Sequence, residues 1–495
     1  MKLKNIINNL DVVEIHGDID IDIEKLAYDS RKVGENTLFI CIKGFNSDGH
    51  KYIESAIEKG AKAFLVEEDV YIDGYTFIKV KNTRAAMAML AANFNNNPSR
   101  EIGVIGVTGT NGKTSISTFI SEILRLNNHK VGLMGTIKIF DGEKEIEASS
   151  TTPESVELQQ YFRNMLNNGC DYCSMEVSSH SLVLNRVDNT EFKLGIFTNL
   201  TQDHLDFHMN LKNYREAKEL LFYKTTEGNI INIDDEGGKL IYDKIKNLAT
   251  PVYTYGIENK ADFMAKNIKI TAEGVSYKLI TPTYEEDMFI PIPGKFTVYN
   301  SLAVIAACYK LNVPKEIIKE GFDKTKGVPG RFETVPNNKG VSVIIDYAHT
   351  PDAIENILKT TKEFAESNII TVFGCGGDRD KSKRPIMGSI AQKLSDMCII
   401  TSDNPRTEDP QLIIDDILKG IDRNKNDYNI VPDREEAIKT AILKANKNDV
   451  VIITGKGHEN YQIIGTKKEY FNDKSLASKY LNIKEMQNEI IMDKL

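Results

Sequence analysis

The chain has 495 residues and a formal net charge of −9, with 27% charged and 41% apolar residues. This length predicts about three domains at the usual 100 to 200 residues each, and the acidic balance argues against a broad nucleic-acid-binding surface, which concentrates Lys and Arg on one face. Nowhere do about 18 apolar residues follow one another, and residues 1–20 carry acids without a long apolar run. We therefore expect a cytoplasmic protein without a signal peptide or a membrane span.

Residues 1–97 alternate short strands with helices and are predicted to form a small α/β domain. Strands are expected at 37–42 and 63–67, and helices at 52–58 and 85–94. The polar run 95–99 ends the last helix and is predicted to be a linker. Two polar loops beside strands, 28–31 and 43–49, are by themselves better explained as ordinary turns. The six cysteines of the chain are scattered, so reduced core thiols are expected rather than a zinc site.

A glycine-rich loop opens the central domain, which is expected over 98–326. The segment 106–115, GVTGTNGKTS, follows an apolar strand at 102–107 and leads into an amphipathic helix. Glycines let backbone N–H groups turn inward, a helix N-terminus adds positive partial charge, Lys113 reaches the outer phosphates, and Thr114 offers a hydroxyl to Mg²⁺. An ordinary turn would explain the glycines but not the Lys-Thr pair. We therefore predict a site for a nucleoside triphosphate, although Val107 stands where the usual P-loop has its first glycine.

The next two strands of the central domain end in side chains that bind metals. A strand at 172–176 delivers Glu176 near its carboxyl end, the edge at which ligands sit in open parallel sheets, so its carboxylate can hold a metal that bridges ATP oxygens. A strand at 194–197 leads to His204 and His208, whose i, i+4 spacing could suggest a zinc hydrolase. The Glu that follows the first His in such motifs is absent, and we prefer one His as a neighbour of Mg²⁺ or of the substrate.

Lys218 lies on the wrong side of its predicted helix for an ordinary lysine. On a helix over 211–222 it shares the apolar stripe of Tyr214 and Leu221, whereas Glu219 and the other charged residues take the opposite face. Lys218 is therefore expected to point inward, where a lysine must snorkel, pair with an acid or lose its charge. The helix alone does not decide between snorkelling and a function.

The last part of the chain is predicted to form a doubly wound, Rossmann-like sheet over 327–495. Before it, strands are expected within 268–279, and Asn300 is expected near the first turn of an apolar helix at 302–308, where it could act as a cap. Strands at 341–345, 369–373, 397–400 and 450–453 each end in a polar motif, and helical segments intervene. Their loops should converge on one crest of the sheet. The glycines within 374–377 lack the spacing of a dinucleotide fingerprint.

Six motifs, which together cover nearly the whole chain, resemble those of the Mur ligase family. They are GTNGKT (109–114), MEVSSH (175–180), TNL with DHLD (198–206), GRFE (330–333), DYAHTP (346–351) and GKGHE (455–459). The resemblance is to the branch that adds the third residue of the peptidoglycan peptide. It implies three α/β domains: one for a UDP-sugar, a P-loop-type ATPase domain and one for the incoming amino acid. It also implies that ATP phosphorylates the D-glutamate γ-carboxylate of UDP-N-acetylmuramoyl-L-Ala-D-Glu to an acyl phosphate, which an amine then attacks.

The resemblance also implies a role for individual residues of this chain. For ATP it implies Gly109, Thr110, Asn111, Gly112, Lys113, Thr114, Ser115, Asn300, Arg331 and Asp346. For the UDP-muramoyl dipeptide it implies Tyr28, Ser30, Thr151, Thr152, Ser178 and Arg186, with Leu184 standing where relatives often have a polar glutamine. For Mg²⁺ it implies Thr114, Glu176, His204 and Lys218, the last as a carbamate, and for catalysis Lys113, Glu176, His204 and Lys218.

The motif Asp403-Asn404-Pro405-Arg406 bears on the incoming amino acid. Meso-diaminopimelate differs from L-lysine by a second carboxylate, and a bidentate arginine is the natural reader of a carboxylate. Arg406 supplies that arginine, and the motif resembles the one in the diaminopimelate-adding branch. Further contacts are implied at Arg379, Gly455 and Glu459, with Glu459 and Asp403 suited to the ammonium end. We therefore predict diaminopimelate over L-lysine.

Three other functions remain as alternatives to a diaminopimelate ligase. A lysine-adding ligase of the same family differs only in the incoming residue, and a folylpolyglutamate synthetase shares the ATP loop but should not carry the Asp-Asn-Pro-Arg motif. A P-loop regulatory ATPase would need no amino-acid pocket, so the crest motifs speak against it. We expect a monomer that binds neither nucleic acid nor a membrane.

Overall fold

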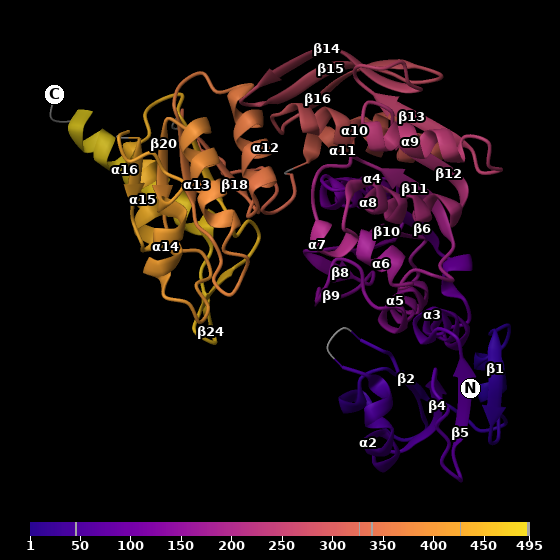
Figure 1. Ribbon diagram of the computed structural model, residues 1–495. Helices are drawn as coiled ribbons and strands as arrows, with labels where there is room; N and C mark the ends of the chain where they lie inside the picture. The colour runs from indigo at the N-terminus through magenta and orange to yellow at the C-terminus, as the bar shows by residue number, and fades with distance from the viewer. Residues whose placement is uncertain (45–46, 326, 338–339, 426, 493–495) are drawn as a thin grey trace. The chain divides into compact units, whose positions relative to one another are not determined.

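The computed structural model describes residues 1–44, 47–325, 327–337, 340–425 and 427–492 of the chain. It divides into two compact units (Figure 1). Unit 1 comprises Met1–Phe263 and Leu302–Ile318, and unit 2 comprises Met264–Ser301 and Lys319–Leu495. The expected domain boundaries at 97/98 and 326/327 stay predictions. Lys326, residues 45–46 of the polar loop at 43–49, and residues 493–495 lie outside the described part of the chain.

The N-terminal part of unit 1 is a five-stranded sheet with helices on both faces. Its elements are α1 (Leu3–Ile6), β1 (Val12–His16), β2 (Lys25–Ala27), β3 (Thr37–Ile40), α2 (Ile53–Glu58), β4 (Ala61–Val66), β5 (Thr76–Val80) and α3 (Thr83–Phe94), with short 3-10 helices at Ser30–Lys32 and Gly49–Tyr52. The strand order is β1-β5-β4-β3-β2, and only β1 is antiparallel to its neighbour. The strands and helices predicted here are confirmed, with ends moved by at most two residues.

The larger part of unit 1 is built around β6, a strand of buried Val, Ile and Gly residues. Its elements are a 3-10 helix at Pro98–Arg100, β6 (Gly103–Thr108), α4 (Lys113–Leu126), β7 (Val131–Met134), β8 (Lys138–Phe140), β9 (Glu145–Glu147), α5 (Ser155–Asn167), β10 (Tyr172–Glu176), α6 (Ser179–Val183), β11 (Phe192–Phe197), α7 (Leu205–His208), α8 (Leu211–Glu219), a 3-10 helix at Leu220–Tyr223, β12 (Thr225–Asn232), α9 (Glu236–Ile245) and β13 (Val252–Gly256). The strand order here is β13-β12-β11-β6-β10-β7-β8-β9. The strands from β13 to β7 are parallel, so their carboxyl ends share one edge.

Unit 2 contains an antiparallel hairpin region and a doubly wound sheet. Its elements are β14 (Phe263–Thr271), β15 (Gly274–Ile280), β16 (Glu285–Ile290), β17 (Glu333–Thr334), β18 (Ser342–Asp346), α12 (Pro351–Lys362), β19 (Ile369–Phe373), α13 (Lys383–Leu394), β20 (Met397–Ile400), α14 (Pro410–Leu418), β21 (Tyr428–Ile430), α15 (Arg434–Lys444), β22 (Val450–Thr454), β23 (Tyr461–Ile464), β24 (Lys467–Tyr470) and α16 (Asp473–Met492). The order of the large sheet is β17-β18-β22-β19-β20-β21, parallel except for β17.

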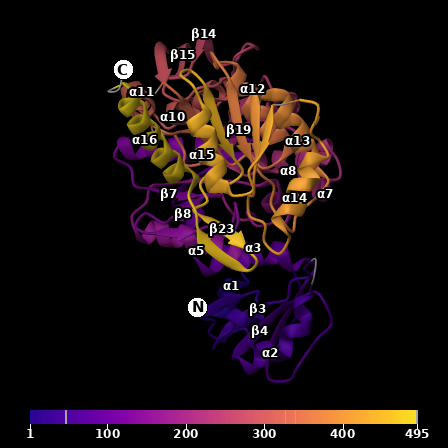
Figure 2. The same ribbon diagram turned by 90° about the vertical axis from the view of Figure 1, so that its left-hand side faces the viewer.

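Helices cover both faces of this sheet, as the doubly wound prediction requires. Buried side chains of β18, β19 and β22 pack against Ala437, Ile438 and Leu481, which lie on α15 and α16. Helices α12, α13 and α14 follow one another on the opposite face (Figure 2). The carboxyl ends of β18, β19, β20 and β22 therefore lie along one crest, and the predicted Rossmann-like arrangement is confirmed.

The expected place of Asn300 at a helix start is wrong. Helix α10 (Lys295–Lys310) begins five residues before Asn300, and α11 (Lys315–Lys324) follows it. The backbone N–H of Thr297 donates to the Gly294 carbonyl at 3.0 Å, so the turn at Gly294 starts the helix. Asn300 is a buried interior residue of α10 and cannot cap it. The prediction missed this start because Phe296 and Val298 alternate with polar residues ahead of the continuous apolar run at 302–308.

The structure also bears on the state of the cysteines and on the possibility of a membrane-spanning helix. All six cysteines lie in the described part of the chain, and each is a buried free thiol. Among the described helices, none combines the length and apolar character that crossing a membrane requires.

Candidate functional site

The predicted phosphate-binding loop, residues 108–112, joins β6 to α4. Gly109 and Gly112 have φ of +149° and +88°. A Cβ on Gly109 would lie 1.8 Å from the Thr198 hydroxyl oxygen, so only glycine fits there. The segment after β11 braces the loop: the Thr198 hydroxyl donates to the Asn111 carbonyl at 2.6 Å, and the Thr110 N–H donates to the Asn199 carbonyl at 2.9 Å. The loop is therefore held in shape by its own chain.

The N-terminus of α4 completes a cationic site at this loop. The helix begins at Lys113 with Gly112 as its N-cap, so Thr114 and Ser115 lie in its first turn. The first N–H groups of a helix carry positive partial charge and favour an anion. The Lys113 ammonium donates to the carbonyl oxygens of Gly109 and Thr110, both at 2.9 Å. It thus lies across the loop that a triphosphate would enter.

Lys218 points to the same loop from α8. Its ammonium donates to the Gly109 carbonyl at 2.8 Å and lies 4.2 Å from the centre of the Tyr214 ring. Only 1% of Lys218 is exposed, which excludes snorkelling. Burial, and next the positive charge of Lys113, hold the pKa of Lys218 well below its usual value. Lys218 is therefore easier to deprotonate than an exposed lysine, and its neutral amine is a nucleophile.

The predicted solvent exposure of Glu219 is wrong. Glu219 is buried because the Lys244 ammonium lies 3.0 Å from its carboxylate and the Tyr223 hydroxyl donates to it at 2.7 Å. Helix α9, which carries Lys244, packs beside α8. The pattern of a single helix cannot show such a neighbour.

Glu176 ends β10 beside the glycine loop, since it is in register with Val107 of β6. It is 1% exposed. Its Oε1 accepts the backbone N–H of Thr136 at 2.8 Å, and its Oε2 accepts the Thr136 hydroxyl at 3.2 Å. The predicted metal ligand therefore has a fixed orientation at the carboxyl edge of the sheet.

The two histidines of the i, i+4 pair have different surroundings. His208 is buried, its Nε2 lies 2.9 Å from the Ser179 hydroxyl, and burial lowers its pKa to about 4. The His204 side chain is 47% exposed, with Nε2 at 3.4 Å from an oxygen of Asp203, and the His204 ring centroid lies 4.8 Å from that of His180. His204 can receive a ligand, whereas His208 is a neutral core residue.

The residues implied for the UDP-muramoyl dipeptide all lie in unit 1, and acids at the start of α5 hold two of them. The Tyr28 hydroxyl donates to Glu157 at 3.0 Å, and a cavity of about 300 Å³ opens beside both residues. The Arg186 side chain pairs with Glu154 at 2.9 Å.

The other four of these residues divide between the two sheets of unit 1. Ser30 begins a 3-10 turn after β2. Ser178 caps α6, while the hydroxyl of Thr152 donates to the Glu176 carbonyl at 2.9 Å and that of Thr151 lies 3.1 Å from the Thr136 hydroxyl. Leu184 follows α6 as its C-cap.

Arg331 and Asp346, the ATP contacts implied in unit 2, lie on adjoining segments of the crest. The Arg331 guanidinium lies 4.9 Å from the centre of the Tyr347 ring, and its buried Nε has no hydrogen-bond partner among the described residues. The Asp346 carboxylate accepts the N–H groups of Phe332 and Ala348, at 2.7 and 2.8 Å. Burial nonetheless raises the pKa of Asp346. An unpartnered buried guanidinium nitrogen suits an anionic ligand.

Residues 403–406 and 455–459, which are predicted to receive the incoming amino acid, lie on the loops after β20 and β22. They are called the acceptor pocket below. Asn404 Nδ2 donates to Glu459 at 2.9 Å, while Asn404 Oδ1 accepts the Lys456 ammonium at 3.0 Å. Lys456 is fully buried and also reaches Glu459 at 3.3 Å. Asp403 is buried against Gly455. The structure thus brings together Asp403, Asn404 and Glu459, which the sequence predicted, and adds Lys456.

Arg406 adopts a left-handed backbone conformation, with φ of +52°. Its guanidinium donates to the Gly377 carbonyl at 2.8 Å, and its backbone pairs with Ile463 and Gly465 around β23. Arg379 lies on the same loop as Gly377 and is exposed. Arg406, the predicted reader of the second carboxylate, and Arg379, a further predicted contact of the amino acid, therefore belong to adjoining loops.

A buried arginine that the sequence analysis missed ties these two loops together. Arg384 is 0% exposed and forms paired hydrogen bonds to Glu408 at 3.0 and 2.8 Å. It also donates to the Gly376 carbonyl at 3.2 Å, and Glu408 accepts the Asp378 N–H at 2.6 Å. No local pattern could indicate this network, because Glu408 lies 24 positions from Arg384 and 30 from Asp378.

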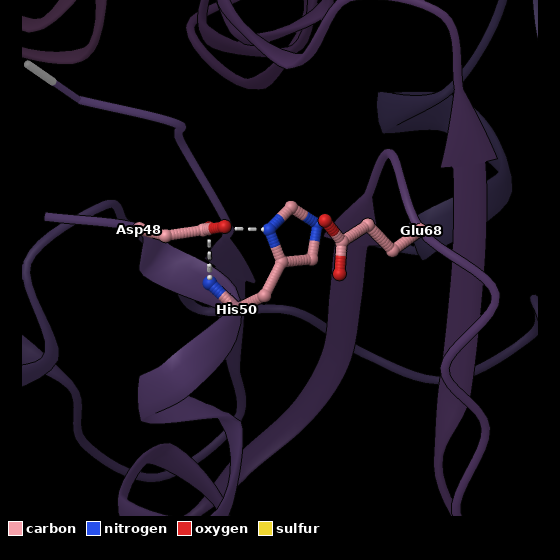
Figure 3. Close-up of side chains that lie close together, drawn as sticks. All are labelled: Asp48, His50 and Glu68. Carbon is pink, nitrogen blue, oxygen red and sulfur yellow. Dashed lines mark hydrogen bonds and ion pairs between the residues drawn. The ribbon is translucent and has the colours of Figure 1, made fainter.

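Three side chains of types that can bind metals lie close together beside the N-terminal sheet of unit 1 (Figure 3). Candidate ligand atoms of Asp48, His50 and Glu68 lie within 4.8 Å of one another. However, His50 Nδ1 lies 2.6 Å from Asp48, His50 Nε2 accepts the Glu67 N–H at 3.0 Å, and Glu68 pairs with Lys43 at 2.9 Å. A metal would have to break these contacts, so we interpret the group as a brace of the turn at Gly49–Tyr52.

Comparison with known proteins gives matches along almost the whole chain. Three domain descriptions match: "Mur ligase family, catalytic domain" at residues 22–95, "Mur ligase middle domain" at 107–308 and "Mur ligase, glutamate ligase domain" at 330–457. A protein of Clostridioides difficile (strain 630), named UDP-N-acetylmuramoyl-L-alanyl-D-glutamate--2,6-diaminopimelate ligase, is 68% identical over 97% of this chain and 100% of its own length. One of the same name from Alkaliphilus metalliredigens (strain QYMF) is 51% identical over 96% of this chain and 97% of its own length. A solved structure under that name has a TM-score of 0.73 at 30% identity, and the match covers 98% of this chain and 99% of the other.

Proposed function

We propose that this chain, which belongs to the Mur ligase family, joins meso-diaminopimelate to the D-glutamate γ-carboxylate of UDP-N-acetylmuramoyl-L-Ala-D-Glu and converts ATP to ADP and phosphate. The observation that carries the proposal is the 68% identity, over nearly the full length, to a ligase of that name. The product is a precursor of peptidoglycan. We further propose a cytoplasmic monomer with a UDP-sugar domain at 1–97, an ATP domain at 98–326 and an amino-acid domain at 327–495.

The glycine loop supports a role in binding the triphosphate. Backbone N–H groups of 109–115 and the N-terminus of α4 offer donors and positive partial charge, and the Lys113 ammonium would leave its own loop to meet the phosphates. Asn300, Arg331 and Asp346 are further proposed ATP contacts. Arg331 has a buried nitrogen suited to an anion.

The donor set near the loop suits Mg²⁺, which prefers oxygen ligands and commonly takes one or two carboxylates together with substrate phosphates. Thr114 offers a hydroxyl, Glu176 a carboxylate and His204 an exposed imidazole. The depressed pKa of Lys218 favours the neutral amine that adds to CO₂, so a carbamate there would supply a further carboxylate. Bound Mg²⁺ would neutralise the charge that builds up between ATP and the substrate carboxylate.

The reaction then needs no protein nucleophile. The γ-carboxylate oxygen of the substrate attacks the γ-phosphorus of ATP, the bond to the ADP oxygen breaks, and an acyl phosphate forms. The amine of the incoming residue attacks the acyl carbon, loses a proton, and phosphate leaves. The protein contributes position and charge: Tyr28, Ser30, Thr151, Thr152, Ser178 and Arg186 are proposed to hold the UDP-muramoyl dipeptide. Leu184 cannot supply the polar contact that a glutamine would make there.

The acceptor pocket suits a zwitterion with a second carboxylate. Asp403 and Glu459 offer negative charge to an ammonium group, whereas Arg406 and Arg379 offer guanidinium groups to a carboxylate. Asn404, Pro405 and Gly455 are further proposed contacts of the amino acid. L-lysine would leave an arginine without its carboxylate, and we therefore propose diaminopimelate as the substrate.

An omission assay tests this function. Phosphate release is measured with ATP, Mg²⁺, UDP-muramoyl dipeptide and meso-diaminopimelate, and then with each component left out. We expect release to require all four. Turnover of ATP without the UDP-muramoyl dipeptide would instead favour a regulatory ATPase.

A further inference from the structure

We propose that Thr136 is a positioning residue that fixes the Glu176 carboxylate for Mg²⁺ and couples the metal site to the binding of the UDP-muramoyl dipeptide. The inference rests on the proposed function, since Mg²⁺ at Glu176 is part of it. Thr136 follows β7, the strand next to β10, and was not among the residues that the sequence analysis selected.

The first observation is that Thr136 binds both oxygens of one carboxylate. Its backbone N–H donates to Glu176 Oε1 at 2.8 Å, and its hydroxyl donates to Oε2 at 3.2 Å. Two donors from one residue fix both the rotation and the tilt of the carboxylate plane. Because a carboxylate oxygen has two lone pairs, each can still accept a second partner such as a metal.

The second observation is the close approach of the Gly135 backbone to the Glu176 carboxylate. A Cβ on Gly135 would lie 2.3 Å from Glu176 Oε1. The backbone of Gly135 and Thr136 therefore approaches the carboxylate more closely than any residue with a side chain allows. The turn after β7 is shaped around Glu176.

The third observation is a one-way chain of hydroxyl groups. The Thr136 and Thr151 hydroxyl oxygens are 3.1 Å apart. An ionised carboxylate only accepts, so the single Thr136 proton goes to Glu176, and the Thr151 hydroxyl must donate to Thr136. Thr151 is a proposed contact of the UDP-muramoyl dipeptide, so Thr136 bridges the metal ligand and the substrate.

The consequence is a thermodynamic coupling between metal and substrate. A substrate that orders Thr151 also orders Thr136 and Glu176, so it should tighten metal binding, and the metal should tighten substrate binding by the same factor. Hydrogen bonds to metal ligands of this kind typically change metal affinity by about 10- to 100-fold when removed.

The test uses Mn²⁺ in place of Mg²⁺, because its free concentration can be measured by electron paramagnetic resonance. The full chain is titrated with Mn²⁺ in the presence of a non-hydrolysable ATP analogue, with and without the UDP-muramoyl dipeptide. Thr136→Val removes the hydroxyl but keeps the backbone N–H, and Thr136→Ser keeps both. Thr361→Val is the matched control, since that buried hydroxyl donates to the Ile357 carbonyl within α12.

We expect Thr136→Val to weaken Mn²⁺ binding about tenfold and to abolish the tightening by the dipeptide, which we expect to be roughly fivefold in the unaltered protein. Thr136→Ser should restore both, and Thr361→Val should change neither. Unaltered Mn²⁺ binding in Thr136→Val, together with a loss in Glu176→Gln, would overturn this inference alone. Unaltered binding in Glu176→Gln would overturn the metal assignment of the proposed function as well.

Discussion

The glycine loop of unit 1 and the acceptor pocket of unit 2 differ in whether carboxylates pair with their buried basic side chains. At the glycine loop, Lys113 and Lys218 both donate to the Gly109 carbonyl, and among the described residues no carboxylate accepts a hydrogen bond from Lys218. At the acceptor pocket, Lys456 and Arg384 are buried against the carboxylates of Glu459 and Glu408. Lys113 and the N-terminus of α4 give the first site the positive charge that the proposed triphosphate requires, whereas the second site balances its charges, as the proposed zwitterionic substrate requires.

The largest effect is expected where positive charge is retained. Lys113→Met should lower kcat/KM for ATP about 10²- to 10³-fold, because a preorganised cation at developing negative charge is lost. The melting temperature should not fall. Lys62→Met, an exposed lysine of β4, is the control and should leave turnover unaltered. A Lys113 variant with ordinary kcat/KM would show that this charge does not serve ATP.

Arg406→Lys tests whether unit 2 recognises the second carboxylate of diaminopimelate. We expect kcat/KM for diaminopimelate to fall roughly 10- to 100-fold, because an ammonium cannot reproduce the two parallel hydrogen bonds of a guanidinium. The corresponding value for L-lysine should change far less. Steady-state kinetics with both amino acids measure the ratio, and Arg423→Lys at an exposed position serves as control. Equal losses for the two amino acids would contradict the assignment of Arg406.

Lys456→Met tests whether charge balance orders the pocket. The variant removes the ammonium that holds Asn404 and Glu459, so the KM for diaminopimelate should rise about tenfold while the KM for ATP stays constant. Lys456→Arg should recover part of the loss. If the KM values for ATP and diaminopimelate rose together, the residue would only support the fold of unit 2.

The smallest effect concerns the acid stability of the Arg384 network. Hydrogen bonds from Arg384 lower the pKa of Glu408 to about 2, from 4.5. A lowered carboxylate pKa stabilises the folded state above the unfolded value, and this contribution is lost as the pH falls from about 4.5 towards 2. In urea unfolding from about pH 6 to about pH 3, Glu408→Gln should lose less stability than the unaltered chain. Glu35→Gln, at an exposed carboxylate, should follow the unaltered chain.

The sequence predicted those parts of the site that follow from local pattern. The four strands of the doubly wound sheet each end in a motif, and the helical stripe placed Lys218 inside. The prediction failed where a residue distant in the sequence determines whether a side chain is buried. Glu219 is buried by Lys244. The start of α10 was missed for a local reason, because Phe296 and Val298 alternate with polar residues ahead of its continuous apolar run.

The residues that the sequence analysis missed share one property. Thr136, Arg384 and Lys456 each bind a side chain that lies 24 to 52 positions away. Such pairs leave no period in the sequence, because nothing in the spacing along one strand or helix encodes which loop lies opposite. Periodicity finds the ends of strands, but the contacts between loops require the fold.

A competition assay tests directly whether the enzyme adds meso-diaminopimelate rather than L-lysine. The full chain is incubated with ATP, Mg²⁺, UDP-muramoyl dipeptide and equal concentrations of meso-diaminopimelate and L-lysine, and the UDP-linked products are weighed by mass spectrometry. We expect the diaminopimelate product to predominate. A product mixture dominated by the lysine adduct would contradict this expectation.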